Sequence, residues 1–307
     1  MTFAVMITTR NRREELRRTL SNVQQLQPQP NEILICADGC TDNTQEMVRS
    51  EFPHCILIEN EQARGSVFSR DRLIRLAKSD IVMSLDDDSY PIDHDFFARL
   101  KELFAQYSQA AVISFPEIRN NAVFAHPTKS PSSPGHLVSA YANCAAAMRR
   151  DVYLRSQGFP IFFDHMYEEP DFALQCYALG YQVWFRPSVG IRHHVTSAQG
   201  DEIGRHHLNA RNELWSVLMR CPFPYVLAVA LFRIWRQFRH ACSKGLTGAI
   251  REPVWWWSAF RGIPTCLRHR SPIDWSVYYA WMKLARKPIR TREELQHVFG
   301  RARLPRL

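Results

Sequence analysis

The apolar run 81–85 ends in three consecutive carboxylates, Asp86, Asp87 and Asp88. Like charges this close together repel one another, which costs stability unless a cation binds beside them. Hard divalent ions such as Mg²⁺ or Mn²⁺ take oxygen ligands and bridge to diphosphates. A solvated acidic turn ahead of a helix is the alternative interpretation. The strand-like run directly before the triplet favours the metal-site interpretation over this alternative.

A second acidic turn follows an earlier apolar run. Asp38 comes directly after the run 33–36 and is followed by the turn-rich residues Gly39 to Asn43. In an open parallel sheet, ligands bind outside the carboxyl ends of the strands. We therefore expect Asp38 and the triplet at 86–88 to lie on the same edge of one sheet, although they are far apart in the sequence.

A third acidic group opens a predicted helix. Glu168, Glu169 and Asp171 stand at its start, and Gly180 follows its far end. Acidic residues in a first turn are favoured by the helix dipole alone, which is the structural alternative. The functional interpretation is a general base held beside the metal site by the helix start.

Histidine and arginine follow this acidic helix at a short distance. His193 and His194 end an extended segment, and Arg205 comes next along the chain. Imidazole is a competent metal ligand, and arginine binds diphosphate oxygens in pairs. Isolated histidines are more often surface or core residues, so position relative to the acidic groups carries this interpretation.

Alternating strands and helices must position these side chains. Short apolar runs at 3–7, 33–36, 55–58 and 81–85 alternate with helical spacing over 16–26, from 44 onward and over 66–78. This alternation implies crossover connections and a Rossmann-like, mostly parallel α/β sheet with helices on both faces. Further along we expect an irregular excursion over 116–136, regular structure over 140–150, a helix over 171–179 and extended segments at 182–185 and 188–194.

The order of these motifs resembles family 2 glycosyltransferases of the GT-A fold, over about residues 3–215. The segments that carry the resemblance are the opening strand and loop 4–12, the acidic turn 37–44, the segment 65–71, the strand and acidic triplet 79–88, the acidic helix start 168–174, Gly180 with Tyr181, and the stretch from Pro187 to His193. Each segment alone is weakly specific, and their shared order makes the resemblance strong.

The resemblance implies an inverting transfer from a nucleotide-sugar, UDP-, GDP- or dTDP-linked, to a hydroxyl of a glycan or lipid-linked acceptor in cell-envelope polysaccharide biosynthesis. Glu169 would be the catalytic base. The donor nucleotide would be bound by Thr8, Asn11, Asp38, Arg70, Asp86, Asp87 and Arg205. The metal, Mn²⁺ or Mg²⁺, would be held by Asp88 and His193, and Glu168 and Asp171 would lie on the acceptor side.

Four positions depart from the family pattern. Ala37 replaces the first acid of the early turn, Asp71 stands where Asn is usual, and Arg10 replaces a common Tyr. Glu169 stands where the family most often has its catalytic Asp. Because of these departures, a catalytically degenerate nucleotide-binding scaffold stays open as an alternative function.

Composition and charge bear on two further classes of protein. Of 307 residues, 39 are basic and 30 acidic, which gives a net charge of +9, and 33 of the basic residues are Arg. A basic protein binding nucleic acid or a membrane surface would fit this charge, yet the acidic triplet would repel nucleic-acid phosphates, so we expect no nucleic-acid partner. A sugar-nucleotide pyrophosphorylase would need a Gly-rich loop after the first strand, and residues 8–12 contain no Gly.

Cysteine usage and the chain start indicate a cytoplasmic protein. The eight cysteines form no CxxC pair, and most have apolar neighbours, which is typical of reduced core residues. The first residues are interpreted as a strand and not as a signal peptide.

Composition shifts near residue 220, where aromatic and aliphatic residues begin to alternate with Arg. We therefore predict a GT-A catalytic domain over 1–220 and a basic, aromatic-rich helical extension over 221–307. Within 223–241 an apolar stripe runs beside Arg233, Arg236 and Arg239, a pattern that suits the surface of an anionic bilayer. The prediction is peripheral attachment to the cytoplasmic face of the inner membrane, and packing of the stripe on the catalytic domain is the alternative.

Overall fold

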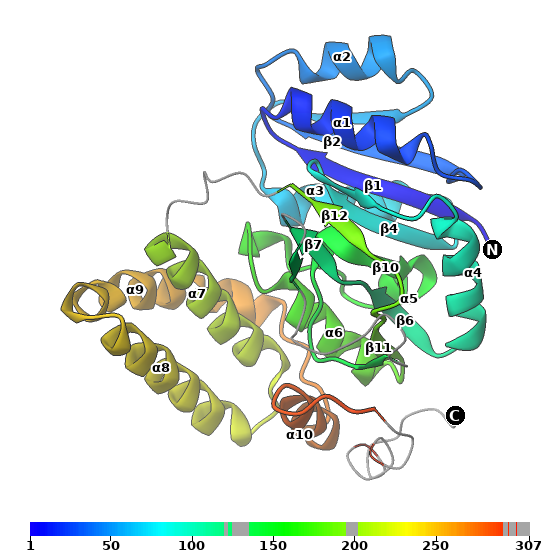
Figure 1. The fold of residues 1–307 in the computed structure, drawn as a ribbon. Coiled ribbons are helices and arrows are strands. Elements are labelled where there is room, and N and C mark those ends of the chain that lie inside the picture. Colours follow the sequence, from blue (N-terminus) through cyan, green and yellow to red (C-terminus); the bar gives the residue numbers. More distant parts are fainter. Residues whose placement is uncertain (120–121, 125–134, 195–201, 291–293, 295–298, 300–307) are drawn as a thin grey trace.

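The computed structural model describes residues 1–119, 122–124, 135–194, 202–290, 294 and 299. Its centre is an eight-stranded sheet in the order β3-β2-β1-β4-β10-β6-β11-β9 (Figure 1). The strands are β1 (Phe3–Thr9), β2 (Glu32–Asp38), β3 (Ile56–Asn60), β4 (Ile81–Asp86), β6 (Ala110–Ser114), β9 (His136–Leu137), β10 (Ala146–Arg149) and β11 (Gln182–Phe185). Only β9 and β10 run against the other six, so the predicted mostly parallel sheet is confirmed.

Helices cover both faces of this sheet because successive strand side chains point to opposite sides. In β1, Val5 and Ile7 pack in one core with α1, α2 and α4, and Ala4 and Met6 pack in the other with α3, α5 and α6. These helices are α1 (Arg13–Val23), α2 (Thr44–Glu51), α3 (Ser66–Leu76), α4 (Phe96–Gln106), α5 (Arg150–Arg155) and α6 (Glu168–Ala178). Buried on both faces, β1, β2 and β4 are mostly apolar, as such strands usually are, while the edge strand β3 is partly exposed.

A second, four-stranded sheet has the order β5-β12-β7-β8. It is built from β5 (Ser89–Pro91), β7 (Glu117–Arg119), β8 (Ala122–Phe124) and β12 (Ile191–His193). The expected irregular excursion over 116–136 is therefore wrong for β7, β8 and β9, while 120–121 and 125–134 lie outside the described residues. Since β12 pairs antiparallel with β5, His193 lies opposite Ser89, next to the acidic triplet.

The acidic residues stand at element ends, as their sequence positions suggested. β2 ends at Asp38 and β4 ends at Asp86, so each acid is the last residue of one of the two parallel strands that flank β1. α6 begins at Glu168, three residues before the expected start, which places Glu168, Glu169 and Asp171 all in its first turn. The carboxyl ends of the strands and the start of α6 thus bring the acidic groups to one side of the sheet.

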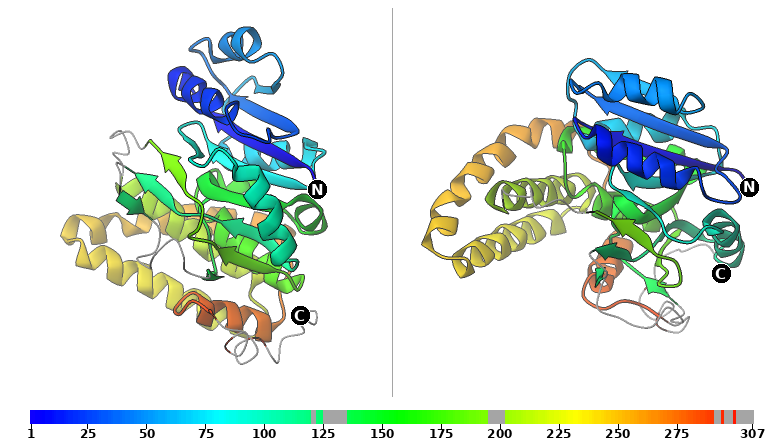
Figure 2. Two further views of the ribbon diagram at one scale, coloured as in Figure 1. Left: turned by 45° about the vertical axis from the view of Figure 1, so that its right-hand side comes forward. Right: turned by 45° about the horizontal axis from the view of Figure 1, so that its top comes forward.

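Four further helices complete the described chain: α7 (Glu202–Arg220), α8 (Tyr225–Ser243), α9 (Leu246–Arg268) and α10 (Trp275–Leu284). Figure 2 shows α7, α8 and α9 projecting together to one side of the sheet. α10 lies against the start of α8, where its Trp275 stacks on Tyr225 with ring centroids 3.8 Å apart. It packs Tyr278 and Trp281 into the core that α6 also lines. No helix in the described ranges is both long enough and apolar enough to cross a membrane.

Candidate active site

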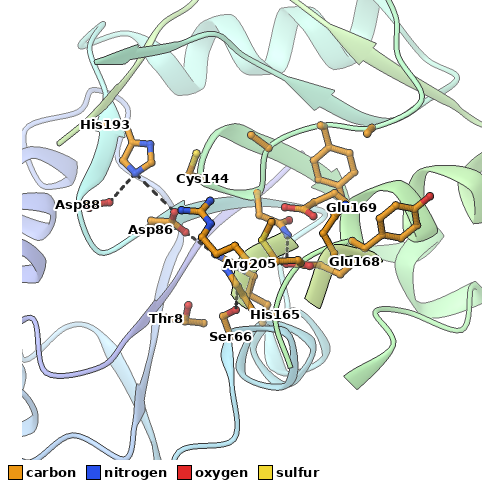
Figure 3. A pocket seen from close by; sticks show the side chains of 18 of the residues that line it. Thr8, Ser66, Asp86, Asp88, Cys144, His165, Glu168, Glu169, His193 and Arg205 are labelled. Atoms are coloured by element: carbon orange, nitrogen blue, oxygen red, sulfur yellow. Dashed lines mark hydrogen bonds and ion pairs between the residues drawn. The ribbon is translucent and has the colours of Figure 1, made fainter. Parts of the chain in front are cut away.

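A cavity of about 590 Å³ opens beside the carboxyl ends of β1 and β4, between the start of α6 and α7 (Figure 3). Its lining is mainly polar and charged. The polar and charged lining side chains include Thr8, Arg12, Ser66, Arg70, Asp86, Asp87, Asp88, Arg119, Asn143, His165, Glu168, Glu169, His193, Arg205 and Asn209. A cavity where several acids and bases converge at strand ends is a candidate ligand site in an α/β fold.

The three carboxylates of the triplet have different surroundings. Arg12 places Nη1 3.0 Å from Asp87 Oδ1 and donates from Nη2 to Asp88 Oδ2 at 2.6 Å. Thr9 Oγ1 donates to Asp87 Oδ2 at 2.9 Å. Burial nevertheless raises the pKa of Asp87 to about 7. Asp87 is therefore held by the first loop, and Asp86 and Asp88 are the members that face the histidine.

His193 connects the second sheet to this triplet. Its Nδ1 lies 2.7 Å from Glu117 Oε2, and its Nε2 lies 3.0 Å from Asp88 Oδ1 and 3.9 Å from Asp86 Oδ2. Burial works to lower the pKa of His193, but the hydrogen bonds to Asp88 and Glu117 outweigh it and raise the pKa to about 9. His193 thus stands among three carboxylates.

This arrangement needs a positive charge between His193 and Asp88. If Nδ1 donates its proton to Glu117, neutral imidazole has only a lone pair at Nε2, which then faces the lone pairs of Asp88 Oδ1 3.0 Å away. Only a proton or a metal cation at this point removes the repulsion. A carboxylate behind the far ring nitrogen is the usual support of a metal-binding histidine, so the residues present fit a divalent cation.

Three donor atoms converge at the same place. Oxygen of Asp86, sulfur of Cys144 and nitrogen of His193 all lie within 4.8 Å of one another. Figure 3 shows these side chains, with Asp88, on the opposite side of the cavity from Glu168 and Glu169. The expected metal ligands Asp88 and His193 are in contact, and Asp86 and Cys144 lie beside His193.

The two glutamates at the start of α6 differ in their contacts. Glu168 is buried and accepts hydrogen bonds from Asn143 Nδ2 at 3.1 Å and Arg70 Nη1 at 3.4 Å. Glu169 lines the cavity, is partly exposed, and has no ion-pair partner in the part of the chain that the structure describes. Burial, reinforced by the charge of Glu168, raises the pKa of Glu169 to about 8. Of the two, Glu169 is the carboxylate that can exchange a proton with a bound molecule.

A family profile matches the first part of the chain. Residues 4–169 match the profile of a family described as Glycosyl transferase family 2, and this stretch covers more than half of the chain. It includes nearly all of β1, the strands β2 to β4, the acidic triplet, and Glu168 and Glu169 at the start of α6. The chain belongs to glycosyl transferase family 2.

A curated relative is similar over a shorter stretch. The chain is 34% identical over 115 residues to a poly-beta-1,6-N-acetyl-D-glucosamine synthase of Staphylococcus aureus (strain COL), which covers 36% of this chain and 28% of the relative. Matching proteins from other strains of that species show 33–34% identity over the same length. The matched stretch is thus little more than a quarter of the relative.

Solved structures share the fold over most of the chain. S. aureus TarS 1-349, crystallised with UDP-GlcNAc, aligns with a TM-score of 0.61 at 13% identity, covering 100% of this chain and 93% of that one. A mannosyltransferase from Pyrobaculum calidifontis, in complex with GDP-Man and Mn²⁺, aligns with a TM-score of 0.57 at 18% identity, covering 92% and 85%. These similarities confirm the GT-A fold of this family 2 chain, including a helical C-terminal region.

The first loops of the family fold hold Asp38 away from the cavity. Asp38 Oδ1 accepts from the Arg64 backbone N–H at 2.8 Å and from Asn60 Nδ2 at 2.7 Å, and Oδ2 accepts from the Gly65 N–H at 2.9 Å. Gly65 has φ +88°, and a Cβ there would lie 2.8 Å from Asp164 O. Asp38 therefore fixes the turn that enters α3, and its carboxylate does not line the cavity.

The remaining expected nucleotide residues are spread over two loops and a helix. Thr8 lines the cavity, and Asn11, at φ 52°, accepts the Thr41 N–H on Oδ1 at 2.7 Å and so joins the loops after β1 and β2. Arg70 is buried, forms ion pairs with both Asp86 and Glu168, and lines the cavity floor. Arg205, from α7, reaches the cavity between the two acidic groups (Figure 3).

Asp171 has a structural environment that its sequence position did not suggest. It is fully buried, and it accepts from Arg220 Nη2 at 2.9 Å, Arg220 Nε at 3.1 Å and Ser216 Oγ at 2.7 Å. These bonds tie α6 to α7. Although it is two residues from Glu169, Asp171 does not line the cavity, because the helix turns its side chain to the opposite face.

Sequence reasoning missed Arg12, Glu117, Asn143 and Cys144. Arg12 carried a usable signal, because it lies in the loop directly after the first strand. Glu117 and Asn143 had no such signal in the sequence. Only the strand pairing brings Glu117 to His193 and Asn143 to Glu168. All eight cysteines are free. Cys144, interpreted from the sequence as one more core residue, proves to lie beside Asp86 and His193.

Proposed function

We propose that this family 2 chain is a metal-dependent inverting glycosyltransferase. It would transfer a sugar from a UDP-, GDP- or dTDP-linked donor to a hydroxyl of a glycan or lipid-linked acceptor in cell-envelope polysaccharide synthesis. One observation carries the proposal. The possible metal ligands around His193 and the carboxylate of Glu169, which has no ion-pair partner in the described residues, face the same cavity from opposite sides. The cavity can therefore hold a diphosphate beside a cation and an acceptor beside a base.

The chain's residues would divide the work as follows. Asp86, Asp88 and His193 hold Mn²⁺ or Mg²⁺, which when bound supplies Lewis-acid stabilisation of charge on the leaving diphosphate. Arg205, which lies between the two acidic groups, adds a guanidinium that can contact the diphosphate. Thr8 contacts the nucleotide from the end of β1.

Other residues predicted to bind the nucleotide would act through the loops they position. Asp38 and Asn11 hold the turns around the cavity, Asp87 anchors Arg12, and Arg70 orients Asp86 and Glu168. Glu168, the acceptor-side candidate, keeps the first turn of α6 against Asn143. These are positioning roles, which differ from the direct nucleotide and acceptor contacts that the family resemblance implied.

Glu169 would be the catalytic base. The acceptor oxygen forms a bond to the anomeric carbon while the bond from that carbon to the diphosphate oxygen breaks, and the acceptor's hydroxyl proton passes to a carboxylate oxygen of Glu169. Because the attack comes from the face opposite the leaving group, the anomeric centre inverts. No enzyme nucleophile is needed.

The first experiment tests which nucleotide-sugar is the donor. We would incubate the full chain with Mn²⁺ and UDP-GlcNAc, GDP-mannose or a dTDP-sugar, and measure release of the nucleoside diphosphate with and without EDTA. UDP-GlcNAc comes first because the similar TarS structure was crystallised with it and the curated relative is named as an N-acetylglucosamine polymer synthase. Release that requires the metal supports the proposal. Donor binding without turnover on any acceptor would instead favour the degenerate scaffold.

We also propose peripheral attachment to the cytoplasmic face of the inner membrane through α8 and α9. Apolar side chains are exposed at helical spacing on both helices: Leu227, Leu231, Trp235 and Phe238 on α8, and Leu246, Ile250, Val254 and Trp257 on α9. Leu231 is 69% exposed and Trp257 64%, which is unusual for side chains this large. Both helices pack on α7, which lines the cavity, so binding of this surface to a membrane would bring the site near a lipid-linked acceptor.

The charge of this region fits an anionic surface, although the predicted arginine stripe is partly wrong. Arg233 and Arg236 turn inward to the buried carboxylate of Glu213 on α7, and of the predicted stripe only Arg239 is an exposed side chain without a carboxylate partner in the described chain. Between residues 221 and 273, however, eight Lys and Arg residues accompany a single acid, Glu252. Glu252 is fully buried, so the exposed surface of α8 and α9 carries no carboxylate to repel anionic lipid.

A further inference from the structure

Cys144 lies at the metal-binding end of the cavity for reasons built into the backbone. It belongs to the short 3₁₀ helix η1 (Asn143–Ala145) directly before β10, and β10 pairs antiparallel with β4 so that Ala146 lies opposite Ser84. The Ser89 hydroxyl donates to the Cys144 carbonyl at 3.1 Å and accepts the Asp86 N–H at 2.8 Å. Paired strands and a bridging hydroxyl thus fix the backbone of Cys144 relative to that of Asp86.

The separations of the donor atoms suit one small cation. The Cys144 sulfur, an Asp86 oxygen and a His193 nitrogen lie within 4.8 Å of one another. Ligands bound at about 2.0–2.3 Å around a tetrahedral ion such as Zn²⁺ are about 3.3–3.8 Å apart. Small rotations of side chains would close the difference. The Glu117 carboxylate, 2.7 Å from His193 Nδ1, already directs Nε2 toward this point.

A sulfur ligand changes which ions the site prefers. Mg²⁺ takes oxygen ligands and binds thiolates poorly, while Co²⁺ and Zn²⁺ bind thiolate together with imidazole and carboxylate. We propose that Cys144 is a metal ligand that makes this site select softer transition ions over Mg²⁺. On binding, the thiol releases its proton to solvent and the sulfur–metal bond replaces it.

The inference rests on the metal site of the proposed function, and its test measures metal binding alone. We would remove metal from the full chain with EDTA, titrate it with Co²⁺, and record the near-ultraviolet sulfur-to-cobalt charge-transfer band. The band should appear in the wild type and in Cys242→Ser, which changes an exposed cysteine of α8. It should be lost in Cys144→Ser. Wild-type protein with no such band, or a band that persists in Cys144→Ser, overturns the inference.

Affinity gives a second measurement on the same proteins. By competition calorimetry, Cys144→Ser should weaken Zn²⁺ and Co²⁺ binding by about 10–100-fold, the range typical when support of a metal site is removed. Mg²⁺ affinity should stay within about twofold. If Cys144→Ser does not fold, the wild type is tested alone. Bound Zn²⁺ must then protect Cys144 from alkylation, which mass spectrometry measures. Equal labelling with and without Zn²⁺ rejects Cys144 as a ligand. Failure here would leave metal-dependent sugar transfer, measured separately with Mn²⁺, unaffected.

Discussion

Glu168 and Glu169 are adjacent in the first turn of α6 but have different surroundings. Glu168 is buried and bonded to Arg70 and Asn143, so its charge is already compensated. Glu169 faces the cavity, and burial together with Glu168 raises its pKa. A carboxylate with a pKa near the working pH is a better proton acceptor than an ordinary one, because it holds the abstracted proton more tightly. With Glu in place of the Asp that is usual in the family, this position still offers the proposed mechanism a carboxylate that can accept a proton.

Replacing Glu169 with Gln tests its role as the base. The amide keeps the shape but cannot take a proton, so kcat should fall by about 10²–10⁴-fold. Donor affinity, measured by calorimetry with Mn²⁺ present, should change less than about threefold. Glu46→Gln, on the exposed face of α2, is the matched control and should have full activity. Turnover of Glu169→Gln within a few-fold of wild type would assign the base elsewhere.

The pH profile follows from the same group. Glu169 must be deprotonated to act, and its pKa is raised to about 8. Activity should therefore rise with pH, about tenfold per unit below pH 8, and level off above it. Residual activity of Glu169→Gln should lack this rise. A wild-type profile already flat from pH 5 upward would show that the carboxylate titrates as an ordinary one during catalysis.

Asp88 is the residue whose loss should affect the metal most directly. It places Oδ1 3.0 Å from His193 Nε2 and accepts from Arg12 on Oδ2, so Asp88→Asn removes one proposed ligand and keeps the shape. We expect Mn²⁺-dependent binding of UDP to weaken at least about tenfold, with metal-free thermal stability close to wild type. Calorimetry that finds unchanged Mn²⁺ and UDP binding would remove Asp88 from the site.

Secondary-structure elements explain which site residues the sequence could predict. Asp38 and Asp86 end the two parallel strands that flank β1, a relation that alternating strands and helices already imply. The resemblance to family 2 adds His193. Glu117 and Cys144 could not be placed. Their nearness to His193 depends on β7 pairing with β12 and on β10 inserting antiparallel beside β4. Both pairings join segments about 60–75 residues apart and leave no local pattern.

The role of Asp171 was also beyond the sequence, for a different reason. Its position two residues after Glu169 suggested a shared function, but residues two apart on a helix point to different faces. Only the packing of α6 on α7 decides that this face meets Arg220. Asp38 is similar, since the direction of its carboxylate is set by the turn at residues 61–65.

The contact between α6 and α7 can be tested through the buried ion pair of Asp171 and Arg220. Removing one partner of a buried ion pair leaves the other charge unpaired, at a cost of about 3–5 kcal/mol. Arg220→Ala should therefore lower the free energy of unfolding by about that amount. Arg155→Ala, which breaks the exposed pair with Asp151, should cost less than about 1 kcal/mol. Urea denaturation compares the two, and equal losses would contradict a structural role for the Asp171–Arg220 pair.

Over the whole molecule, the sheet and its helices enclose the main core, while α8 and α9 extend beyond it with apolar side chains exposed. The inner face of α8 contacts the rest of the protein. Val226 and Val229 join the main core, and Arg233 and Arg236 form ion pairs with Glu213. The outer face alone is without a protein partner in the described structure. Truncating the chain after residue 221 would also remove α10 from that core, so substitutions on the outer face give the sharper test.

Liposome flotation tests membrane attachment with the full chain. Leu227→Ser, Leu231→Ser and Trp257→Ser combined remove three exposed apolar side chains, each worth about 1.5–3 kcal/mol when buried, so partition into vesicles containing phosphatidylglycerol should fall at least about a hundredfold. The control combines Leu154→Ser and Leu179→Ser, exposed positions near α5 and α6, and should float like wild type. Raising salt should weaken wild-type binding, since exposed basic residues contribute a screened attraction. If wild type does not float, or floats no better than the triple variant, the outer face of α8 and α9 does not bind lipid.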